Sequence, residues 1–215
     1  MKDKAADRKG TLTMLHIEPV TLSTDRIVLR PLSLNDVPAL AAAAEDGSLW
    51  EKKTTTVPRP EGFGDYVRKA LELQAAGLAL PFTTVVREGG QVVGSTRYMN
   101  IDAANHRVEI GTTWIAKSWQ RTFVNTHAKF LMLRHAFEGL GCNAVELRTH
   151  RLNDQSRAAI ERLGAKLDGI LRQHMIMPDG HVRDTVVYSI IRDEWPAVKA
   201  ELERRMAELG AVSAP

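Results

Sequence analysis

The amino-acid sequence predicts a fold of the mixed α/β (α+β) class, in which helices flank a single, mostly antiparallel sheet. Three observations predict it. Segments 82–87, 91–101 and 107–115 alternate apolar and polar residues and are joined by short turns, as in an antiparallel meander. Segment 126–140 has helical periodicity and separates the third of these strands from the next, at 143–149. Because a helix connects them, those last two strands can pair in parallel, as a single crossover in the middle of the sheet.

The chain before the meander contributes one strand and two helices. Alternation over 26–32 predicts the first strand. An alanine-rich helix over 36–44 follows, with Ser33 or Asn35 as its N-cap. Residues 62–77 carry an apolar stripe at helical spacing and predict the second helix. The polar segment between the two helices is expected to be a long loop, of the kind that serves as a linker or a functional lid.

Turns and caps define the remaining elements. Gly89 and Gly90 are expected to form a two-residue hairpin turn inside the meander. Asn153 or Asp154 is expected to cap a short helix over 155–163. The last elements are strands at 166–177 and 181–191, a turn at 178–180 between them, and a helix at 193–209 capped by Asp193.

Composition indicates one soluble globular domain. The 215 residues include 44% hydrophobic and 26% charged side chains, and no apolar run approaches the length that spans a bilayer. We expect a single domain over 21–209, with flexible tails at 1–20 and 210–215. The net charge of +3 comes without a basic run, so neither nucleic acid nor a membrane is expected as a partner. A single cysteine, Cys142, excludes an intramolecular disulfide and fits a reducing, cytoplasmic compartment.

Several common catalytic and cofactor motifs are absent from the sequence. There is no GxxxxGK[ST] phosphate cradle, no GxGxxG, no HExxH helix and no GxSxG elbow. The seven histidines do not fall at the spacing of zinc ligands, so no metal is expected. Cys142 follows a predicted helix end and is expected to be a small buried filler rather than a nucleophile.

The junction between the third meander strand and the long helix is the main candidate for a binding site. A strand that turns into a helix leaves unpaired N–H groups and the positive end of the helix dipole, which attract phosphate. Five polar side chains fall there: Gln120, Arg121, Thr122, Asn125 and Thr126. An ordinary polar connector has the same local pattern, so the pattern alone leaves both interpretations open.

Short motifs spread along the chain, together with the order of elements, carry a family resemblance. The motifs are Leu29-Arg30-Pro31, Val93-Gly94-Ser95, Val108-Glu109-Ile110-Gly111, and Asn153 followed by Ser156, Arg157 and Ile160-Glu161-Arg162-Leu163-Gly164. Over about residues 22–191 the chain resembles the GNAT superfamily of N-acetyltransferases, and within it the branch of ribosomal-protein N-terminal acetyltransferases. The resemblance implies a GNAT-like sheet with a splayed central strand pair, acetyl-CoA as co-substrate, and transfer of an acetyl group to a primary amine.

The resemblance also implies where acetyl-CoA lies. Its pantetheine arm would pair with the end of the third meander strand, at Trp114, Ile115 and Ala116, as an added strand. Asn153 and Arg157 would contact the cofactor from the short helix. The pyrophosphate would meet the loop formed by Gln120, Arg121, Thr122, Phe123, Val124, Asn125 and Thr126.

This loop departs from the family's usual pattern, Q/R-x-x-G-x-G/A. Gln120 matches, but Phe123 and Asn125 stand where glycine and a small residue are expected. Glycine lets the backbone approach a pyrophosphate closely and take a positive φ, and phenylalanine does not. Either the Phe123 ring packs elsewhere and leaves its N–H available, or the pyrophosphate is displaced and bound by side chains such as Arg121. A third possibility is that cofactor binding has been lost.

By the same resemblance, the reaction needs a base for the amine and an acid for the leaving thiolate. Glu109 is the candidate base, because it alternates with two apolar residues and projects from the other face of the sheet. Its structural alternative is a surface carboxylate paired with Arg97 or Arg107. The family's usual tyrosine acid is missing from the short helix, and Ser156 stands near that place. Ser156 could donate the proton or position a water, or only hydrogen-bond locally in its helix.

The acceptor amine is expected to enter beside the first two helices, where Trp50, Arg97 and His174 are candidate contacts. A protein N-terminus and a small-molecule amine both remain open as acceptors. Two rival readings have other functions. One is a non-catalytic CoA-binding or regulatory module with the same fold. The other is a structural homodimerisation domain that uses the apolar stripe of the last helix, from Trp195 to Met206.

Overall fold

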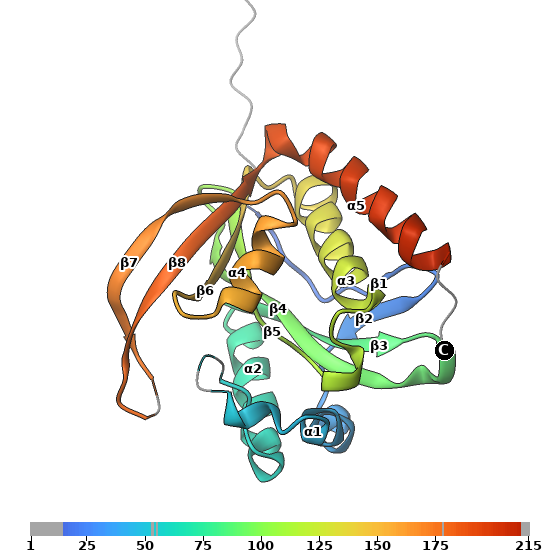
Figure 1. The fold of residues 1–215 in the computed structure, drawn as a ribbon, viewed down its shortest axis with the longest axis vertical. Coiled ribbons are helices and arrows are strands. Elements are labelled where there is room, and N and C mark those ends of the chain that lie inside the picture. Colours follow the sequence, from blue (N-terminus) through green and yellow to red (C-terminus); the bar gives the residue numbers. More distant parts are fainter. Residues whose placement is uncertain (1–14, 53, 55, 178, 212–215) are drawn as a thin grey trace, which may run out of the picture.

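The computed structural model describes residues 15–52, 54, 56–177 and 179–211. It contains one eight-stranded sheet in the order β1-β2-β3-β4-β5-β6-β8-β7 (Figure 1). The strands are β1 (Leu22–Ser23), β2 (Ile27–Pro31), β3 (Ala79–Val86), β4 (Val92–Asp102), β5 (Arg107–Ile115), β6 (Ala144–His150), β7 (Lys166–Ile176) and β8 (Val182–Ile191). The α-helices are α1 (Val37–Glu45), α2 (Phe63–Ala75), α3 (Phe123–Arg134), α4 (Asp154–Glu161) and α5 (Trp195–Ala211).

The crossover predicted in the middle of the sheet is present. All described strand pairs are antiparallel except β5 and β6, which are parallel and connected by α3. The parallel pairing extends only from Arg107 opposite Ala144 to Glu109 opposite Glu146. Beyond Glu109 the two strands diverge, which leaves a V-shaped opening in the sheet. This confirms the predicted class, a mixed sheet with a splayed central pair.

The sheet separates two apolar cores. On one face, α3 and α5 pack against each other and cover a large core that includes Val108, Ile110 and Leu131. On the other face, α1 and α2 cover a smaller core that includes Trp114 and Phe63. Figure 1 shows α1 and α2 below the sheet and α3 and α5 above it. The face covered by α1 and α2 is called the α2 face below, and the opposite one the α3 face.

Helix α3 begins three residues earlier than predicted. The Thr122 side chain accepts a hydrogen bond from the Val124 N–H at 3.3 Å and so caps the helix ahead of Phe123. A side-chain cap of this kind satisfies one of the N–H groups that a helix start leaves free. The helix continues after Arg134 as a π-helical turn, His135–Gly139. Residues 123–126 are therefore its first turn and not part of the loop.

Two local predictions were wrong: the two-residue hairpin turn at Gly89 and Gly90, and the helix cap at Asp193. The turn after β3 is a three-residue 3₁₀ turn, Glu88–Gly90, in which both glycines are left-handed, with φ of 74° and 66°. Asp193 does not cap the last helix. The Glu194 carboxylate accepts from the Ile191 N–H at 3.1 Å, so the chain enters α5 through a preceding 3₁₀ turn.

The C-terminal helix belongs to the core of its own chain. Trp195, Val198 and Leu202 are buried, and the Trp195 ring stacks on Phe137. A stripe used in this way is not available to a second copy, so the dimerisation reading of α5 was wrong. No helix among the described residues is long and apolar enough to cross a membrane.

The domain reaches further toward the N-terminus than the expected boundary at residue 21. Leu15 is buried and its N–H donates to the Ala103 carbonyl at 3.4 Å, and Ile17 and Val20 also pack against the core. At the other end α5 continues to Ala211. The rest of the two expected tails, 1–14 and 212–215, lies outside the described residues.

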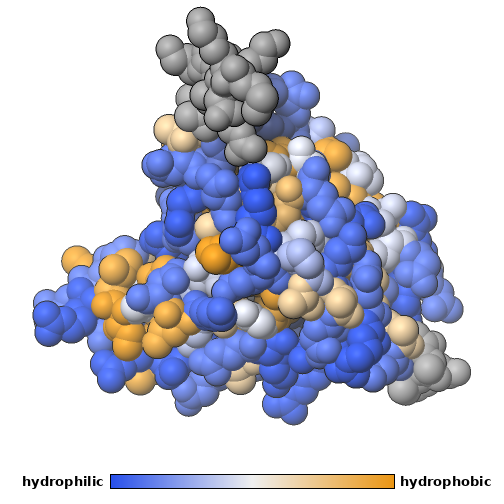
Figure 2. Space-filling view, turned by 90° about the horizontal axis from the view of Figure 1, so that it is seen from above, coloured by the Kyte–Doolittle hydropathy of each residue, from blue (hydrophilic) through white to orange (hydrophobic). Residues whose placement is uncertain are grey.

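The β7–β8 hairpin extends beyond the helices at one edge of the sheet (Figure 1). Figure 2 shows apolar side chains gathered on this side of the molecule. The exposed large apolar residues of the hairpin are Leu167, Ile170, Leu171, Met175, Ile176, Val182 and Ile191. In the described chain no helix covers this part of β7, which is an edge strand.

Candidate active site

Glu109 occupies the vertex of the V, at the last paired position of β5. Val108 and Ile110 on either side of it belong to the core under α3, so its side chain projects from the α2 face. The carboxylate is 6% exposed, accepts from Asn100 Nδ2 at 2.7 Å, and lies 3.3 Å from Arg148 Nε. Burial raises the pKa of Glu109 above its ordinary value. Its partners are therefore Asn100 and Arg148, and not the expected Arg97 or Arg107.

A bulge in β5 turns the end of this strand toward the same face. The register with β4 shifts between Arg97 opposite Gly111 and Ser95 opposite Trp114, and Thr112 has a left-handed φ of 48°. An extra residue reverses the alternation that follows it. Trp114 therefore faces α2, where its Nε1 donates to the Tyr66 hydroxyl at 3.2 Å.

Close packing against the bulged end of β5 explains why the Val93-Gly94-Ser95 motif has a glycine at its centre. A Cβ on Gly94 would lie 2.2 Å from the Trp114 carbonyl oxygen, closer than any real side chain allows. Gly94 thus lets β4 and the bulged end of β5 approach each other. The motif keeps the backbone of Trp114, Ile115 and Ala116 at the open edge of the V.

The loop between β5 and α3 is held by its own hydrogen bonds. Gln120 Nε2 donates to the Ile115 carbonyl at 2.9 Å, and the Thr122 hydroxyl donates to the Trp119 carbonyl at 2.8 Å. Arg121 is left-handed, with φ of 63°, and exposed, and its guanidinium has no hydrogen bond or ion pair with any described residue. The loop thus presents a free cation next to a helix N-terminus, an arrangement that suits phosphate.

Phe123 fits this loop because it is the first residue of the helix and needs no positive φ. The left-handed residue is Arg121, two positions before the expected glycine. The Phe123 ring packs edge-on against Trp119 and His127, and the Arg26 guanidinium lies 3.6 Å from its centre. The Phe123 ring therefore packs away from the proposed phosphate site, the first of the possibilities given for this residue. The Val124 N–H donates to the Thr122 hydroxyl, and the other first N–H groups of α3 stay free of intrahelical partners.

Helix α4 carries the remaining predicted cofactor residues. Asn153 caps it, as its Oδ1 accepts from the Ser156 N–H at 3.1 Å. The Ser156 hydroxyl makes no hydrogen bond to a described residue, so it is free for a ligand or water. Arg157 Nε donates to the Tyr188 hydroxyl at 3.3 Å, and Tyr188 donates to Glu161 at 2.8 Å.

Tyr188 is a residue that sequence reasoning missed beside α4. It is buried, and its hydroxyl reaches the helix from β8, so a tyrosine stands near the place where the family's usual one is missing. Contacts between residues about thirty positions apart leave no local pattern. The alternation of β8 predicts only that the Tyr188 side chain lies on the same face as its buried neighbours.

The predicted acceptor residues are only partly brought together. Arg97 lies on the α2 face, 7% exposed, with its guanidinium carbon 5.5 Å from the centre of the Tyr66 ring. His174 Nδ1 is 3.0 Å from the Thr185 hydroxyl, on the β7–β8 hairpin. Trp50 has its Nε1 buried without a partner, and its ring faces Arg59. No hydrogen bond or ring contact of the described residues joins Trp50 or His174 to Glu109.

The α3 face contains a buried lysine that the sequence did not reveal. Lys129 is 6% exposed and its Nζ donates to the Thr113 hydroxyl at 2.9 Å, while Thr113 bonds Thr96 at 2.7 Å. Burial without a carboxylate lowers the pKa of Lys129 to about 7. In the sequence Lys129 was indistinguishable from an ordinary surface lysine of an amphipathic helix.

Cys142 is buried, as predicted, and burial raises the pKa of its thiol to about 11. At neutral pH it is a thiol and a poor nucleophile. The described residues contain no group of three or more His, Cys, Asp or Glu side chains placed to hold a metal.

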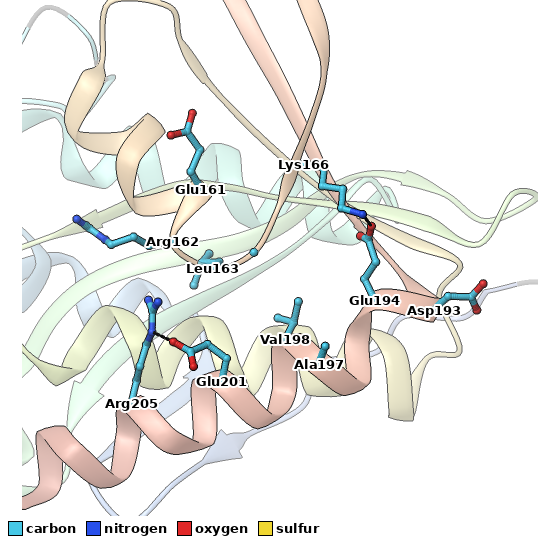
Figure 3. A pocket seen from close by; sticks show the side chains of 11 residues that line it. Glu161, Arg162, Leu163, Lys166, Asp193, Glu194, Ala197, Val198, Glu201 and Arg205 are labelled. Atoms are coloured by element: carbon cyan, nitrogen blue, oxygen red, sulfur yellow. Dashed lines mark hydrogen bonds and ion pairs between the residues drawn. The ribbon is translucent and has the colours of Figure 1, made fainter.

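A surface hollow of about 630 Å³ lies between α4 and α5, away from Glu109 (Figure 3). Three of its carboxylates already have partners. Glu194 pairs with Lys166 and Glu201 with Arg205, both at 2.6 Å, and Glu161 accepts from Tyr188. Arg162 and Asp193 also line the hollow; both are exposed, and neither side chain makes a hydrogen bond or ion pair with a described residue.

These features have counterparts in known proteins. A family model, the acetyltransferase (GNAT) domain, matches residues 26–166. The chain belongs to this family of acetyltransferases.

Individual relatives agree with that assignment. YdaF of Bacillus subtilis, a candidate ribosomal N-acetyltransferase, is 34% identical over 110 residues, 51% of this chain and 59% of YdaF. The crystal structure of a GCN5-related N-acetyltransferase from Brucella melitensis has a TM-score of 0.80 at 31% identity, over 88% of this chain and 86% of that one. Mycobacterium smegmatis RimJ, solved with CoA-disulfide, has a TM-score of 0.73 at 22% identity over 87% and 95% of the two chains, which shows the shared fold.

Proposed function

We propose that this protein transfers an acetyl group from acetyl-CoA to a primary amine by direct attack in a ternary complex. The observation that carries the proposal is the V between β5 and β6 with Glu109 buried at its vertex. A ligand in the V has access to backbone N–H and C=O groups that β5 and β6 no longer share. Its reactive end would then meet a carboxylate on the α2 face.

The cofactor residues divide into backbone and side-chain groups. Trp114, Ile115 and Ala116 line the open edge of β5 and offer their backbone to the pantetheine arm. The first N–H groups of α3 and the free guanidinium of Arg121 would bind the pyrophosphate. Val124, Asn125 and Thr126 contribute as residues of that first turn. On the other arm of the V, Asn153 and Arg157 of α4 complete the proposed cofactor site.

The chemistry follows from the charges that change during transfer. The amine must lose a proton before its nitrogen can attack the thioester carbon, and Glu109 accepts that proton directly or through water. Its raised pKa brings it closer to that of the amine, which helps a base that works near neutral pH. Collapse of the tetrahedral intermediate breaks the C–S bond, and the CoA thiolate takes a proton from Ser156 or from a water at that position.

Both kinds of acceptor stay in the proposal. YdaF, whose name gives it as a ribosomal N-acetyltransferase, supports a protein acceptor, and a small amine is the alternative. The cytoplasmic location and the homodimer expected from the sequence stay predictions.

A non-catalytic CoA-binding module is the second candidate. Two polar side chains that match the family, Gln120 and Asn153, use their side-chain oxygen or nitrogen in internal hydrogen bonds. This observation favours a cofactor site that is weaker than usual. A protein that binds CoA and releases none of its thiol with any amine would have this second function.

Isothermal titration with acetyl-CoA tests the proposal first. We expect a dissociation constant between about 1 μM and 1 mM, the range of ordinary enzyme substrates. Amines are then screened for release of CoA thiol, with the protein-free reaction as control. Absence of heat at millimolar acetyl-CoA would rule out both the enzyme and the binding module.

A further inference from the structure

Arg97 is a buried cation that has no anion. It lies on β4, 7% exposed, and its Nε has no hydrogen-bond partner among the described residues. No described carboxylate lies within 4.0 Å of it. The contact that the guanidinium does make is with the Tyr66 ring, whose hydroxyl accepts from Trp114. Arg97 therefore lies, without an anionic partner, on the same face of the sheet as Glu109, the proposed base.

The two glutamates on that face already have partners. Glu146 pairs with Arg107 at 2.6 Å and with Arg148 at 2.7 Å. Glu109 is held by Asn100 and Arg148. A further guanidinium near Glu109, that of Arg183, hydrogen-bonds only the Thr185 hydroxyl. Of the four arginines Arg97, Arg107, Arg148 and Arg183, only Arg107 and Arg148 pair with these two glutamates, so arginines outnumber glutamates on the α2 face around Glu109.

An arginine cannot resolve such a burial by losing its proton, because the guanidinium stays charged at any pH at which proteins fold. Burying an unpaired charge is costly, and a cation–π contact returns only part of that cost. The planar guanidinium presents N–H groups in the geometry that fits a carboxylate with two hydrogen bonds. The missing partner is therefore an oxyanion that arrives with a ligand.

The place of Arg97 relative to Glu109 limits which ligand this is. Arg97 is directly opposite Gly111 in the β4–β5 register, and Glu109 is two residues from Gly111 on the same face. Such diagonal neighbours lie about 7–8 Å apart. A Cβ on Gly111 would be 2.6 Å from Met99 Sδ and 3.0 Å from Glu109 Oε1, so the glycine leaves that space to these two side chains. One small molecule can reach both side chains.

Resting on the acetyl transfer proposed above, we infer that the acceptor carries a carboxylate close to its reacting amine, and that Arg97 binds this carboxylate. Two sources supply the chemistry. One is the α-carboxylate of a free amino acid. The other is an acidic side chain in the first residues of a peptide. In both, Glu109 meets the nitrogen while Arg97 holds the anion.

The test compares amines that differ only by one carboxylate: tryptophan against tryptamine, and lysine against cadaverine. Release of CoA is followed at saturating acetyl-CoA. We expect kcat/KM to be about tenfold or more higher for the carboxylated amine, as for a charge-assisted hydrogen-bonded pair, and the ratio to fall to about one in Arg97→Gln. C-terminally amidated peptides that begin Ser-Asp or Ser-Asn distinguish the two sources. Arg172→Gln, on exposed β7, should leave every ratio unchanged.

Equal rates within each pair, or a ratio that Arg97→Gln does not alter, would overturn the inference while acetyl transfer itself stands. If no amine is turned over, N-acetyltryptophan and N-acetyltryptamine are titrated into the CoA-saturated protein. Tighter binding of the carboxylate that disappears in Arg97→Gln supports the inference, and equal or no binding overturns it. Failure to bind acetyl-CoA is a separate result, which rules out the proposed function.

A folding role for Arg97 gives a different signature. Arg97→Met removes the unpaired cation and keeps much of the side-chain volume, so in the free protein Tm should rise by a few degrees. An arginine that serves only the fold would lower Tm when replaced. The variant should also bind acetyl-CoA like the wild type.

Discussion

Lys129 and Arg97 are two buried cations on opposite faces of one sheet. Both are more than nine-tenths buried, and neither has a carboxylate within 4.0 Å among the described residues. Lys129 donates to a threonine hydroxyl on the α3 face, and Arg97 lies against an aromatic ring on the α2 face. The difference between them is chemical: a lysine can become neutral, and an arginine cannot.

That difference separates the two faces by role. Burial lowers the pKa of Lys129 to about 7, so near neutral pH the amine is partly uncharged and the apolar core under α3 tolerates it. The α2 face instead keeps fixed charges that only ligands or partner side chains can balance. We therefore assign chemistry to the α2 face and mainly structural roles to the α3 face.

The largest expected effect tests whether the α2 face is the chemical one. Glu109→Gln removes the base and keeps its shape, and we expect kcat/KM to fall by about 10²–10⁴-fold. Because burial raises the pKa of Glu109, the wild-type rate should decline as pH falls through a value above the usual one for a glutamate, and the variant should lose that limb. The measurement is the pH dependence of thiol release.

Glu146→Gln is the matched control for this experiment. Glu146 is the next carboxylate on the same face, and its pKa is lowered by Arg107 and Arg148 although burial acts against them. It should contribute through those arginines, with a smaller loss of rate and no change in the acid limb. Equal losses in both variants would show that Glu109 is only one member of an ion-pair network.

The second prediction concerns the stability of the α3 face. At pH values below about 7 Lys129 is charged in both the folded and unfolded states, so its burial penalty is fully present. Between about 7 and the ordinary lysine value the unfolded chain binds more protons, so stability rises with pH. Lys129→Met should therefore raise the free energy of unfolding at pH 7 by about 1–4 kcal/mol and flatten this rise.

Urea unfolding at pH 7 and pH 9.5 measures both effects. Lys69→Met, an exposed substitution on α2, should change the free energy by less than about 0.5 kcal/mol at either pH. A Lys129→Met variant that folds well but no longer binds acetyl-CoA would break the division of roles, because the lysine would then serve the cofactor.

The smallest expected effect is on CoA affinity, and it concerns Arg121 in the loop between β5 and α3. Arg121 is exposed, so its contribution is screened by solvent. Arg121→Ala should weaken CoA about tenfold and leave the affinity for pantetheine, which lacks the pyrophosphate, almost unchanged. Arg162→Ala, another exposed arginine, on the α4 side, is the control. Equal losses for CoA and pantetheine would contradict the pyrophosphate assignment.

Local sequence patterns were sufficient for much of the fold. The bounds of β5, a cap at Asn153 or Asp154, the crossover through α3 and the buried Cys142 were all predicted, because each depends on periodicity or on cap residues a few positions apart. Glu109 was found in the same way, as the polar member of an alternating strand.

Other features depend on contacts between elements that are far apart in the sequence. The bulge at Thr112 that turns Trp114 toward α2 follows from the pairing of β5 with β4, and the sequence of β5 alone does not fix it. Phe123 is the first residue of α3 because Thr122 caps the helix one position earlier. Tyr188 reaches α4 from a strand that follows it in the chain.

The sequence by itself determined the class of fold, its family and the carboxylate at the centre of the proposed reaction. Only the tertiary structure decided which cations are unpaired. Lys129 and Arg97 look ordinary in the sequence, since a charge becomes informative through its surroundings, and those surroundings are assembled from strands and helices far apart along the chain. Electrostatic energy depends on distance and burial in space, and a linear sequence specifies neither until it folds.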